Sequence, residues 1–195
     1  MFINPNDSTV ASEAEAWTAS QASHWGYVPN YAAAFESRPD VARAWTVLNT
    51  TIRDGMDRRR FEIATIAAAR ALQNTYCNVA HSKFLRDVCR DEDAVVALAS
   101  DAQGEVLDDI DQAIVDFAGK VARSASTVSA EDVDELRVVG LSDNEIADIV
   151  FAVTARSFFT RVLDGMGVLT DHELAASFEP SLVERMIVGR PVGSA

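Results

Sequence analysis

Cysteine is scarce in this chain, with two residues among 195, Cys77 and Cys89. Two cysteines cannot build the disulfide framework of a small secreted domain, and a reducing compartment leaves both as thiols unless one is catalytic. Histidine is nearly as rare, with three residues. A thiol and an imidazole four residues apart, Cys77 and His81, are therefore the first candidates for chemistry.

Long apolar runs are also missing. The most apolar stretches, residues 63–72 and 146–155, are too short to span a bilayer, and each contains a charged residue, Arg70 or Asp148. The first seven residues have neither a basic start nor a long apolar run, unlike a secretory signal. We therefore expect a soluble, cytoplasmic protein.

Basic residues are outnumbered, because 17 Lys and Arg stand against 30 Asp and Glu, and the formal net charge is −13. Such a chain is repelled by phosphate backbones and by anionic membrane surfaces. Residues 128–154 superficially match a DNA-binding helix-turn-helix, but from 129 to 148 seven acidic residues face the single Arg137. We expect neither nucleic acid nor a membrane as a partner.

Strand patterns are absent too, since no segment alternates apolar and polar residues for long. Apolar residues instead recur at spacings of three and four, which indicates amphipathic helices. Helices are expected near residues 12–23, 39–54, 58–72, 75–88, 107–121, 129–138 and 142–163. We predict one all-α domain over residues 1–195, a bundle of about seven or eight helices, with a tail from residue 179 that is either mobile or packed on a neighbouring subunit.

The second of these helices has an expected apolar stripe of Val41, Ala44, Trp45 and Leu48. Residues at these spacings share one face of a helix. This face is predicted to pack into the core.

Cys77 and His81 lie on one face of a helix, because residues four apart stand one turn above the other. Asn74 is a favourable N-cap and would place Cys77 in the first turn, where backbone N–H groups and the helix dipole favour an anion. We expect this thiol to ionise more easily than a free cysteine. The alternative is a buried cysteine beside a histidine that hydrogen-bonds a neighbouring carbonyl.

Glu62 is a candidate to orient His81, because it is an acidic residue within the otherwise apolar and small stretch 61–69. On one straight helix Glu62 and Cys77 would be about 22 Å apart, at roughly 1.5 Å per residue. A chain reversal near residues 72–74 would instead place Glu62 opposite His81 across a helical hairpin. The three residues then form a proton relay; the alternative for Glu62 is a solvated position on the helix surface.

Glu62 followed by the run Tyr76-Cys77-Asn78-Val79-Ala80-His81 resembles the core motif of the alkylhydroperoxidase D and carboxymuconolactone decarboxylase superfamily, in particular its peroxidase-related branch. The likeness extends to residues 26–30, 38–39, 141–146 and 158–161. It implies an all-helical AhpD-like domain, a motif core at about residues 58–90 and a homo-oligomer, a trimer or hexamer. It also implies that Cys77 is the peroxidatic thiol, His81 the relay histidine and Glu62 the relay carboxylate.

Two positions depart from the pattern of alkylhydroperoxidase D. Those proteins carry a C-x-x-C pair before the histidine, and Asn74 stands where the first cysteine falls, so no local disulfide can form. Cys89 lies about 18 Å from Cys77 along a continuous helix, and it could resolve an oxidised Cys77 only through a helix break or from another subunit. An external thiol would otherwise be needed. Tyr76 replaces a histidine, and either hydrogen-bonds an oxyanion or packs as an aromatic.

Three functions remain open. The first and preferred one is a thiol-dependent peroxidase of peroxiredoxin type, which acts on a small peroxide with an external thiol reductant. The second is a decarboxylase- or isomerase-like lyase for a small carboxylate or lactone, with His81 and Glu62 in acid-base roles. The third is a non-enzymatic oligomeric helical protein. We expect no cofactor and no metal, because one Cys, one His and one Glu leave a zinc site short of a ligand.

Overall fold

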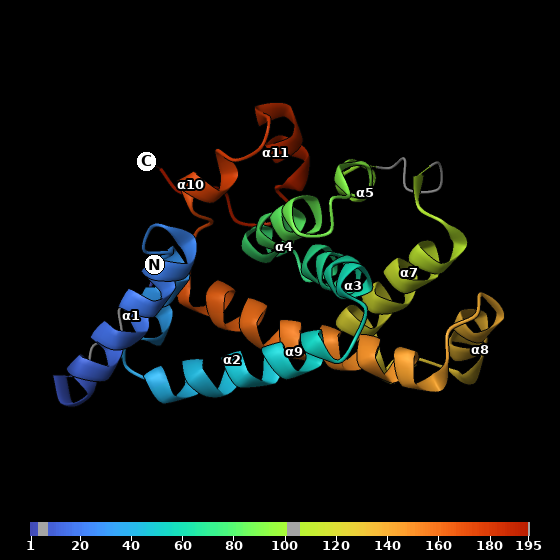
Figure 1. Cartoon of the computed structure of the whole chain (residues 1–195), viewed down its shortest axis with the longest axis horizontal. Helices are drawn as coiled ribbons and strands as arrows, with labels where there is room; N and C mark the ends of the chain where they lie inside the picture. The colour runs from blue at the N-terminus through green and yellow to red at the C-terminus, as the bar shows by residue number, and fades with distance from the viewer. Residues whose placement is uncertain (4–7, 101–105, 195) are drawn as a thin grey trace.

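The computed structural model describes residues 1–3, 8–100 and 106–194, and most of them are helical (Figure 1). The seven longer α-helices of these residues are α1 (Ala11–Trp25), α2 (Pro39–Asp54), α3 (Arg58–Ala71), α4 (Thr75–Asp87), α7 (Asp109–Ser124), α8 (Ala130–Val138) and α9 (Asp143–Met166). The shorter elements are α5 (Glu92–Leu98), α10 (His172–Ala175), α11 (Pro180–Met186) and the 3-10 helices η1 (Ser8–Val10), η2 (Asn30–Phe35) and η3 (Ala125–Thr127).

The all-α prediction is confirmed. Within the described ranges the one β-type pairing is an isolated bridge between Thr170 and Val192. No helix in the described part of the chain is long and apolar enough to cross a membrane.

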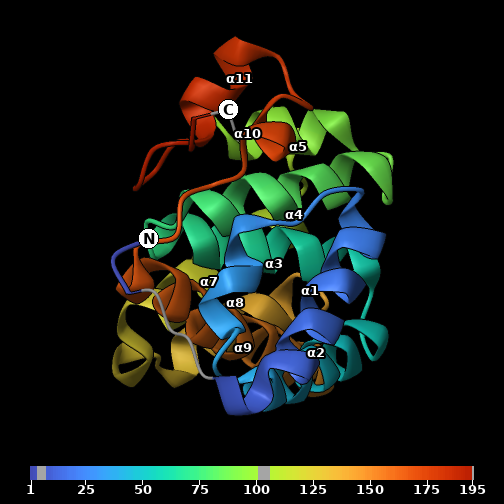
Figure 2. The same ribbon diagram turned by 90° about the vertical axis from the view of Figure 1, so that its left-hand side faces the viewer.

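α3 is the central helix of the molecule and packs against α4, α7 and α9. Residues 61–69 of α3 are all buried, so this helix is covered on every side. Four of these nine residues are alanines, and small side chains let neighbouring helices approach closely. Figure 2 shows α4 between α3 on one side and the C-terminal helices α10 and α11 on the other. The position of α4 is thus fixed from two sides.

The chain reverses between α3 and α4, as the sequence predicts. Gln73 adopts a left-handed conformation with φ of 57°. Asn74 then caps α4, because its Oδ1 accepts a hydrogen bond from the backbone N–H of Cys77 at 2.8 Å. The reversal sets the two helices side by side as a hairpin.

α2 packs on α9 and on η2, but its apolar stripe differs from the expected one. Val41 and Trp45 pack against the core, whereas Ala44 and Leu48 are exposed, and the side chain of Leu48 is 50% exposed. Ala42 is fully buried instead. The buried face of α2 is rotated relative to the face that the residue spacing predicts. The reason is that α9 and η2 contact the helix beside the predicted face.

The C-terminal segment packs on its own chain. The backbone N–H groups of Val188 and Gly189 donate to Oγ1 of Thr75, the first residue of α4, at 3.3 and 3.1 Å. Gly189 lies so close to the carbonyl oxygen of Gln73 that a Cβ built on it would be 1.8 Å from that oxygen. This segment therefore helps to fix the start of α4.

We predict that Gly189→Ala lowers the free energy of unfolding by about 1–3 kcal/mol, because the added methyl group forces the tail away from Gln73. Urea denaturation followed by circular dichroism measures the change. Gly165→Ala is the matched control, since a Cβ there contacts nothing within 4 Å and the residue lies in helix α9. This variant should gain up to about 1 kcal/mol. Equal effects of the two substitutions would contradict the close packing of the tail.

Candidate active site

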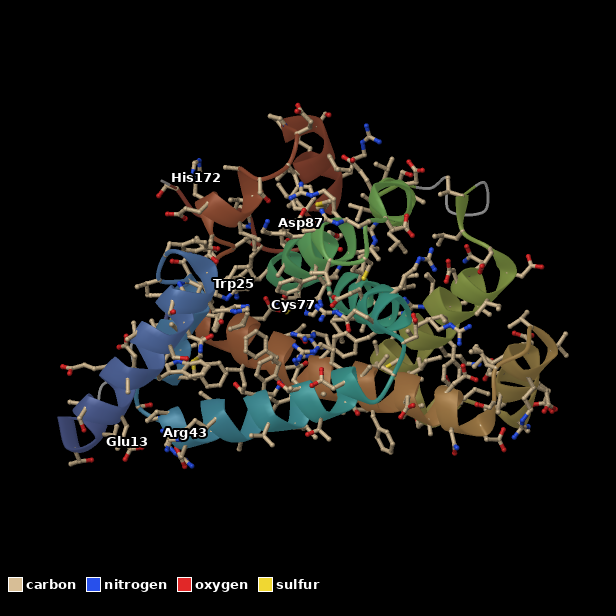
Figure 3. The ribbon with its side chains drawn as sticks, viewed as in Figure 1. Glu13, Trp25, Arg43, Cys77, Asp87 and His172 are labelled. Carbon is tan, nitrogen blue, oxygen red and sulfur yellow. The ribbon has the colours of Figure 1, made fainter. Side chains whose placement is uncertain are left out.

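A cavity of about 330 Å³ lies between α1, η2, α2, α4 and α9, and both Cys77 and His81 line it. Its wall is largely aromatic, with contributions from Trp17, Trp25, Tyr31, Trp45, Phe84 and Phe159. The side chains of Cys77 and His81 are almost completely buried, with 1% and 5% of their surface exposed. Figure 3 shows Cys77 in the interior, with Trp25 at the end of α1 on the side of the cavity.

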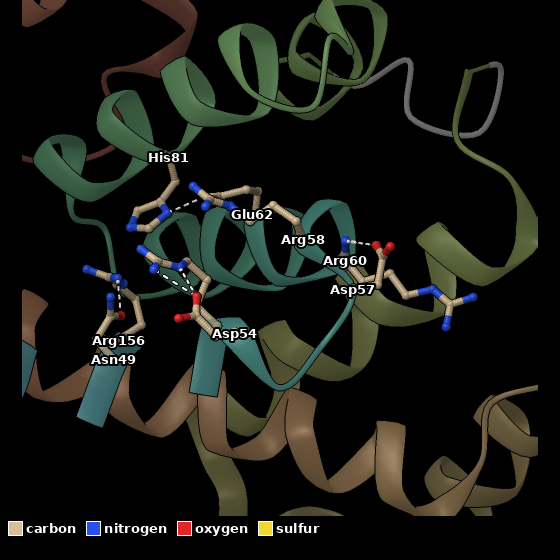
Figure 4. A network of polar contacts seen from close by, with 9 residues as sticks. Asn49, Asp54, Asp57, Arg58, Arg60, Glu62, His81 and Arg156 are labelled. Atoms are coloured by element: carbon tan, nitrogen blue, oxygen red, sulfur yellow. Dashed lines mark hydrogen bonds and ion pairs between the residues drawn. The ribbon is translucent and has the colours of Figure 1, made fainter. Parts of the chain in front are cut away.

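Glu62 is fully buried and has two partners (Figure 4). Its Oε1 accepts a hydrogen bond from Nε of Arg58 at 2.6 Å, and its Oε2 lies 2.5 Å from Nδ1 of His81. A carboxylate oxygen accepts, so the imidazole donates from Nδ1 and its Nε2 is left as a proton acceptor. The structure thus brings Glu62 and His81 together across the helical hairpin.

His81 is a neutral base in this environment. Burial of the ring, together with the nearby positive charge of Arg156, lowers its pKa to about 4, although Glu62 acts in the opposite direction. A neutral imidazole with one free nitrogen can take a proton at neutral pH. His81 lines the cavity, so this nitrogen serves a thiol or a ligand inside it.

Cys77 has a cation next to its sulfur atom. Nη1 of Arg156 lies 3.7 Å from Sγ of Cys77, and Nη2 of Arg156 donates to Oδ1 of Asn49 at 3.1 Å. Burial nevertheless raises the pKa of Cys77 above its usual value, and Arg156 only opposes this rise. The expectation that Cys77 ionises more easily than a free cysteine is therefore wrong, because desolvation outweighs the start of the helix and the guanidinium. The thiol needs a base, and His81 is on the next turn.

Arg156 is the main residue of the site that our reading of the sequence missed. It stands on the buried face of α9, in register with Ile149, Val153 and Thr160 at spacings of three and four. A single cation within such an apolar series is a signal that could have marked it. Arg58 was also detectable, because it precedes Glu62 by four residues, the spacing of helical ion pairs.

Tyr76 uses its hydroxyl group outside the cavity. Tyr76 and Tyr27 both donate to Oδ2 of Asp171, whose Oδ1 accepts the backbone N–H of Asn30 at 2.7 Å. Asp171 is 2% exposed, and its three donors offset the cost of its burial. Of the two roles considered for Tyr76, the structure favours the packing aromatic, since its hydroxyl is engaged and its ring lines the cavity.

Cys89 lies beyond the end of α4, and α4 is continuous from Thr75 to Asp87. Both cysteines are free thiols. A separation of about 18 Å along the helix exceeds the reach of a disulfide by far. Resolution of Cys77 by Cys89 of the same chain is therefore excluded. Among the residues that the structure describes, no group of three or more His, Cys, Asp and Glu could hold a metal ion.

The comparisons agree with this architecture. Residues 39–104 match the model of the carboxymuconolactone decarboxylase family. No curated protein matches the chain. A solved structure of an uncharacterized peroxidase-related protein from Silicibacter sp. TM1040 is similar, with 21% identity, a TM-score of 0.75, and 88% of this chain and 91% of that chain covered.

Two further solved structures are similar in fold. One is the alkylhydroperoxidase AhpD core of an uncharacterized peroxidase-related protein from Ralstonia eutropha JMP134, with 21% identity, a TM-score of 0.71 and 97% of each chain covered. The other is the debrominase Bmp8, with 17% identity, a TM-score of 0.68, and 93% of this chain and 96% of that chain covered. A variant of Bmp8 with one cysteine changed to alanine has been solved with 2,3,4-tribromopyrrole.

At these sequence identities the solved structures show similarity of fold alone. The family match covers the segment that contains Glu62, Cys77 and His81. Together the two findings show that residues 39–104 are similar to the carboxymuconolactone decarboxylase family and that the chain has the fold of the AhpD-like proteins.

Proposed function

We propose that the protein is a thiol-dependent peroxidase that uses Cys77 as its nucleophile, His81 as base, Glu62 as the group that orients the base, and Arg156 as the cation beside the sulfur. One observation carries this proposal: the thiol, the neutral imidazole and the guanidinium line the same cavity. A nucleophile, a base held by a third group, and a positive charge at the reacting atom are the parts that thiol catalysis requires.

The proposed reaction starts with transfer of the Cys77 thiol proton to Nε2 of His81. The thiolate attacks the distal oxygen of a hydroperoxide, so that an S–O bond forms while the O–O bond breaks. The departing alkoxide takes the proton from His81 and leaves as an alcohol, and Cys77 becomes a sulfenic acid. Arg156 stabilises the thiolate and the negative charge that moves onto the departing oxygen.

The sulfenic acid then needs two external thiols. The first forms a mixed disulfide with Cys77 and releases water, and the second reduces that disulfide and restores the free thiol. Cys89 of the same chain is too far away to replace either of them.

Assembly into a homo-oligomer, a trimer or hexamer, remains a part of the proposal. Phe151 and Phe158 on α9 are 55% and 42% exposed, and Val47 and Leu48 on α2 are 66% and 50% exposed. Exposed aromatic and aliphatic side chains are enriched where proteins associate.

A second candidate function is the reductive removal of a halogen from a small aromatic ring. The observation that favours it is the aromatic wall of the cavity around a reactive cysteine. The fold is shared with a debrominase, a variant of which was solved with a brominated pyrrole. The balanced reaction would convert an aryl bromide and two thiols into the arene, hydrogen bromide and a disulfide.

For the peroxidase we predict that Cys77 reacts with tert-butyl hydroperoxide to a sulfenic acid, trapped by dimedone and located by mass spectrometry. His81→Ala should slow this reaction by about 100-fold, because the base is lost. Glu62→Gln should also slow it, since the amide orients the imidazole less well. Arg156→Met removes the charge at the sulfur and should cost about as much as His81→Ala.

Cys89→Ser is the matched control and should retain the rate, because Cys89 lies outside the cavity. A Cys77 that reacts as slowly as free cysteine and does not respond to His81→Ala would refute the peroxidase. A lyase would reveal itself by turnover of a small carboxylate or lactone that persists in Cys77→Ser.

The lowered pKa of His81 predicts a pH dependence of stability. Between pH 4 and 6.5 the unfolded chain binds a proton at this residue and the folded chain does not, so stability falls as the pH drops. From pH 7 to 5 this contribution amounts to about 2 kcal/mol. In urea titrations His81→Gln should flatten the pH slope, whereas the exposed His24→Gln should keep it. Identical slopes in all three proteins would exclude a neutral, buried His81.

The dehalogenase is tested with 2,3,4-tribromopyrrole and an external thiol, by ion chromatography of released bromide. If this function holds, the wild-type protein releases bromide and Cys77→Ala does not, because the nucleophile is missing. Release no faster than in a sample without protein would eliminate it.

A further inference from the structure

Arg156 is a buried cation for which the described part of the chain supplies no acidic partner. Its side chain has 3% of its surface exposed, and it contacts the neutral thiol of Cys77 and the neutral amide oxygen of Asn49. Its Nε is buried and has no hydrogen-bond partner in the described part of the chain. A guanidinium has five N–H donors, and these two contacts leave most of them unused. A buried charge in this state favours the arrival of an anion.

Arg58 differs from Arg156 in that a carboxylate of the same chain neutralises its charge. Arg58 lies one helical turn from Glu62 and forms an ion pair with it. Arg156 has no such partner among the residues that the structure describes, although most of the chain's 30 acidic residues are among them. Cys77 does not fill this role in the resting state, because its burial disfavours the thiolate. The positive charge of Arg156 is therefore available to a ligand.

The rest of the cavity wall agrees with an anionic ligand. Two arginines, Arg53 and Arg156, line it, and none of the described Asp or Glu residues does. Arg53 has its ion pair with Asp54, which is 61% exposed and does not line the cavity. Glu62 lies behind His81 and is likewise not part of this wall. The cavity is thus locally positive in a protein of net charge −13.

Flat aromatic rings stand directly beside Arg156. The rings of Trp45 and Phe159 are stacked with their centroids 4.1 Å apart. Cζ of Arg156 lies 5.4 Å from the ring centroid of Trp45 and 5.5 Å from that of Phe159. Such a wall favours a planar, unsaturated ligand over a flexible aliphatic one. A volume of about 330 Å³ is at the lower end for ligand pockets and selects a small molecule.

We propose that this cavity binds a small aromatic carboxylate, with its acid group at Arg156 and its ring against Trp45 and Phe159. The proposal goes beyond the proposed function by assigning the class of ligand that the cavity around Cys77 binds. A carboxylate has no O–O bond, so it is not itself the group that Cys77 reduces. The carboxylate supplies the charge that Arg156 lacks, and the aromatic ring occupies the apolar part of the cavity near the sulfur. A neutral alkyl hydroperoxide uses neither feature.

Intrinsic fluorescence gives a direct test, because all three tryptophans of the chain line the cavity. The wild-type protein is titrated with benzoate, which has both ring and charge, with benzyl alcohol, which has the ring alone, and with acetate, which has the charge alone. Benzoate should bind at least tenfold more tightly than either of the others. Equal binding of benzyl alcohol, or no binding of benzoate, overturns the proposal.

Variants of two arginines on α9 test whether Arg156 is the residue that binds the carboxylate of benzoate. Arg156→Met should abolish the preference for benzoate over benzyl alcohol. Arg156→Lys keeps the positive charge with a smaller change in shape and should retain part of this preference, which covers the case that the methionine variant fails to fold. Arg161→Gln is the matched control, because Arg161 is exposed and does not line the cavity. A benzoate preference that survives Arg156→Met, or that Arg161→Gln removes, overturns the assignment.

A last measurement separates this site from the proposed function. Oxidation of Cys77 by tert-butyl hydroperoxide is followed with and without benzoate, and benzoate should slow it in proportion to its occupancy. Oxidation that saturating benzoate leaves unchanged overturns the location of the site while the peroxidase stands. Tight benzoate binding to a Cys77 that no peroxide oxidises refutes the peroxidase while the carboxylate site stands.

Discussion

The burial of one carboxylate, that of Glu62 in the middle of α3, is the constraint on which the site depends. An ionised group without water is costly unless partners satisfy both of its oxygens. Arg58 and His81 do so here, one from the same helix and one from α4. This requirement holds α3 and α4 at a fixed rotation relative to each other. It also fixes the tautomer of His81, so the same interaction that stabilises the hairpin prepares the base.

Cys77 and Arg156 form the second pair of the site, beside the pair of Glu62 and His81. The thiol is too deeply buried to ionise readily, and the guanidinium has no anionic partner among residues 1–3, 8–100 and 106–194. A proton moved from the thiol to His81 would create a thiolate next to a waiting cation. Charge separation in a water-poor cavity is favourable only where both resulting charges have partners. Glu62 provides this partner for the imidazolium, and Arg156 provides it for the sulfur.

The helical hairpin and the contact between Glu62 and His81 could be predicted because their causes are local in the sequence. Asn74 as a cap, a reversal near residue 73 and the symmetric placement of Glu62 and His81 about it are enough to define them. Arg156 could not be placed, because it is 79 positions from Cys77 and only the packing of α9 brings them together. The pKa of Cys77 was misjudged for the same reason. The direction of the pKa shift depends on how completely other helices cover the thiol. The spacing of residues along α4 does not reveal this.

Asn74 shows how the lone thiol and the fold are connected. At the position where the alkylhydroperoxidase D pattern that this sequence resembles has a second cysteine, the amide oxygen of Asn74 caps α4 at the N–H of Cys77, and the side chain is 2% exposed. A thiol is a much weaker acceptor than an amide oxygen, so this residue strengthens the helix start at the expense of a local disulfide. In the proposed peroxidase cycle, the electrons for Cys77 then come from a molecule that enters the cavity. Since the cavity is small and Cys77 lines it, the proposed cycle requires oxidant and reducing thiol to occupy it in turn.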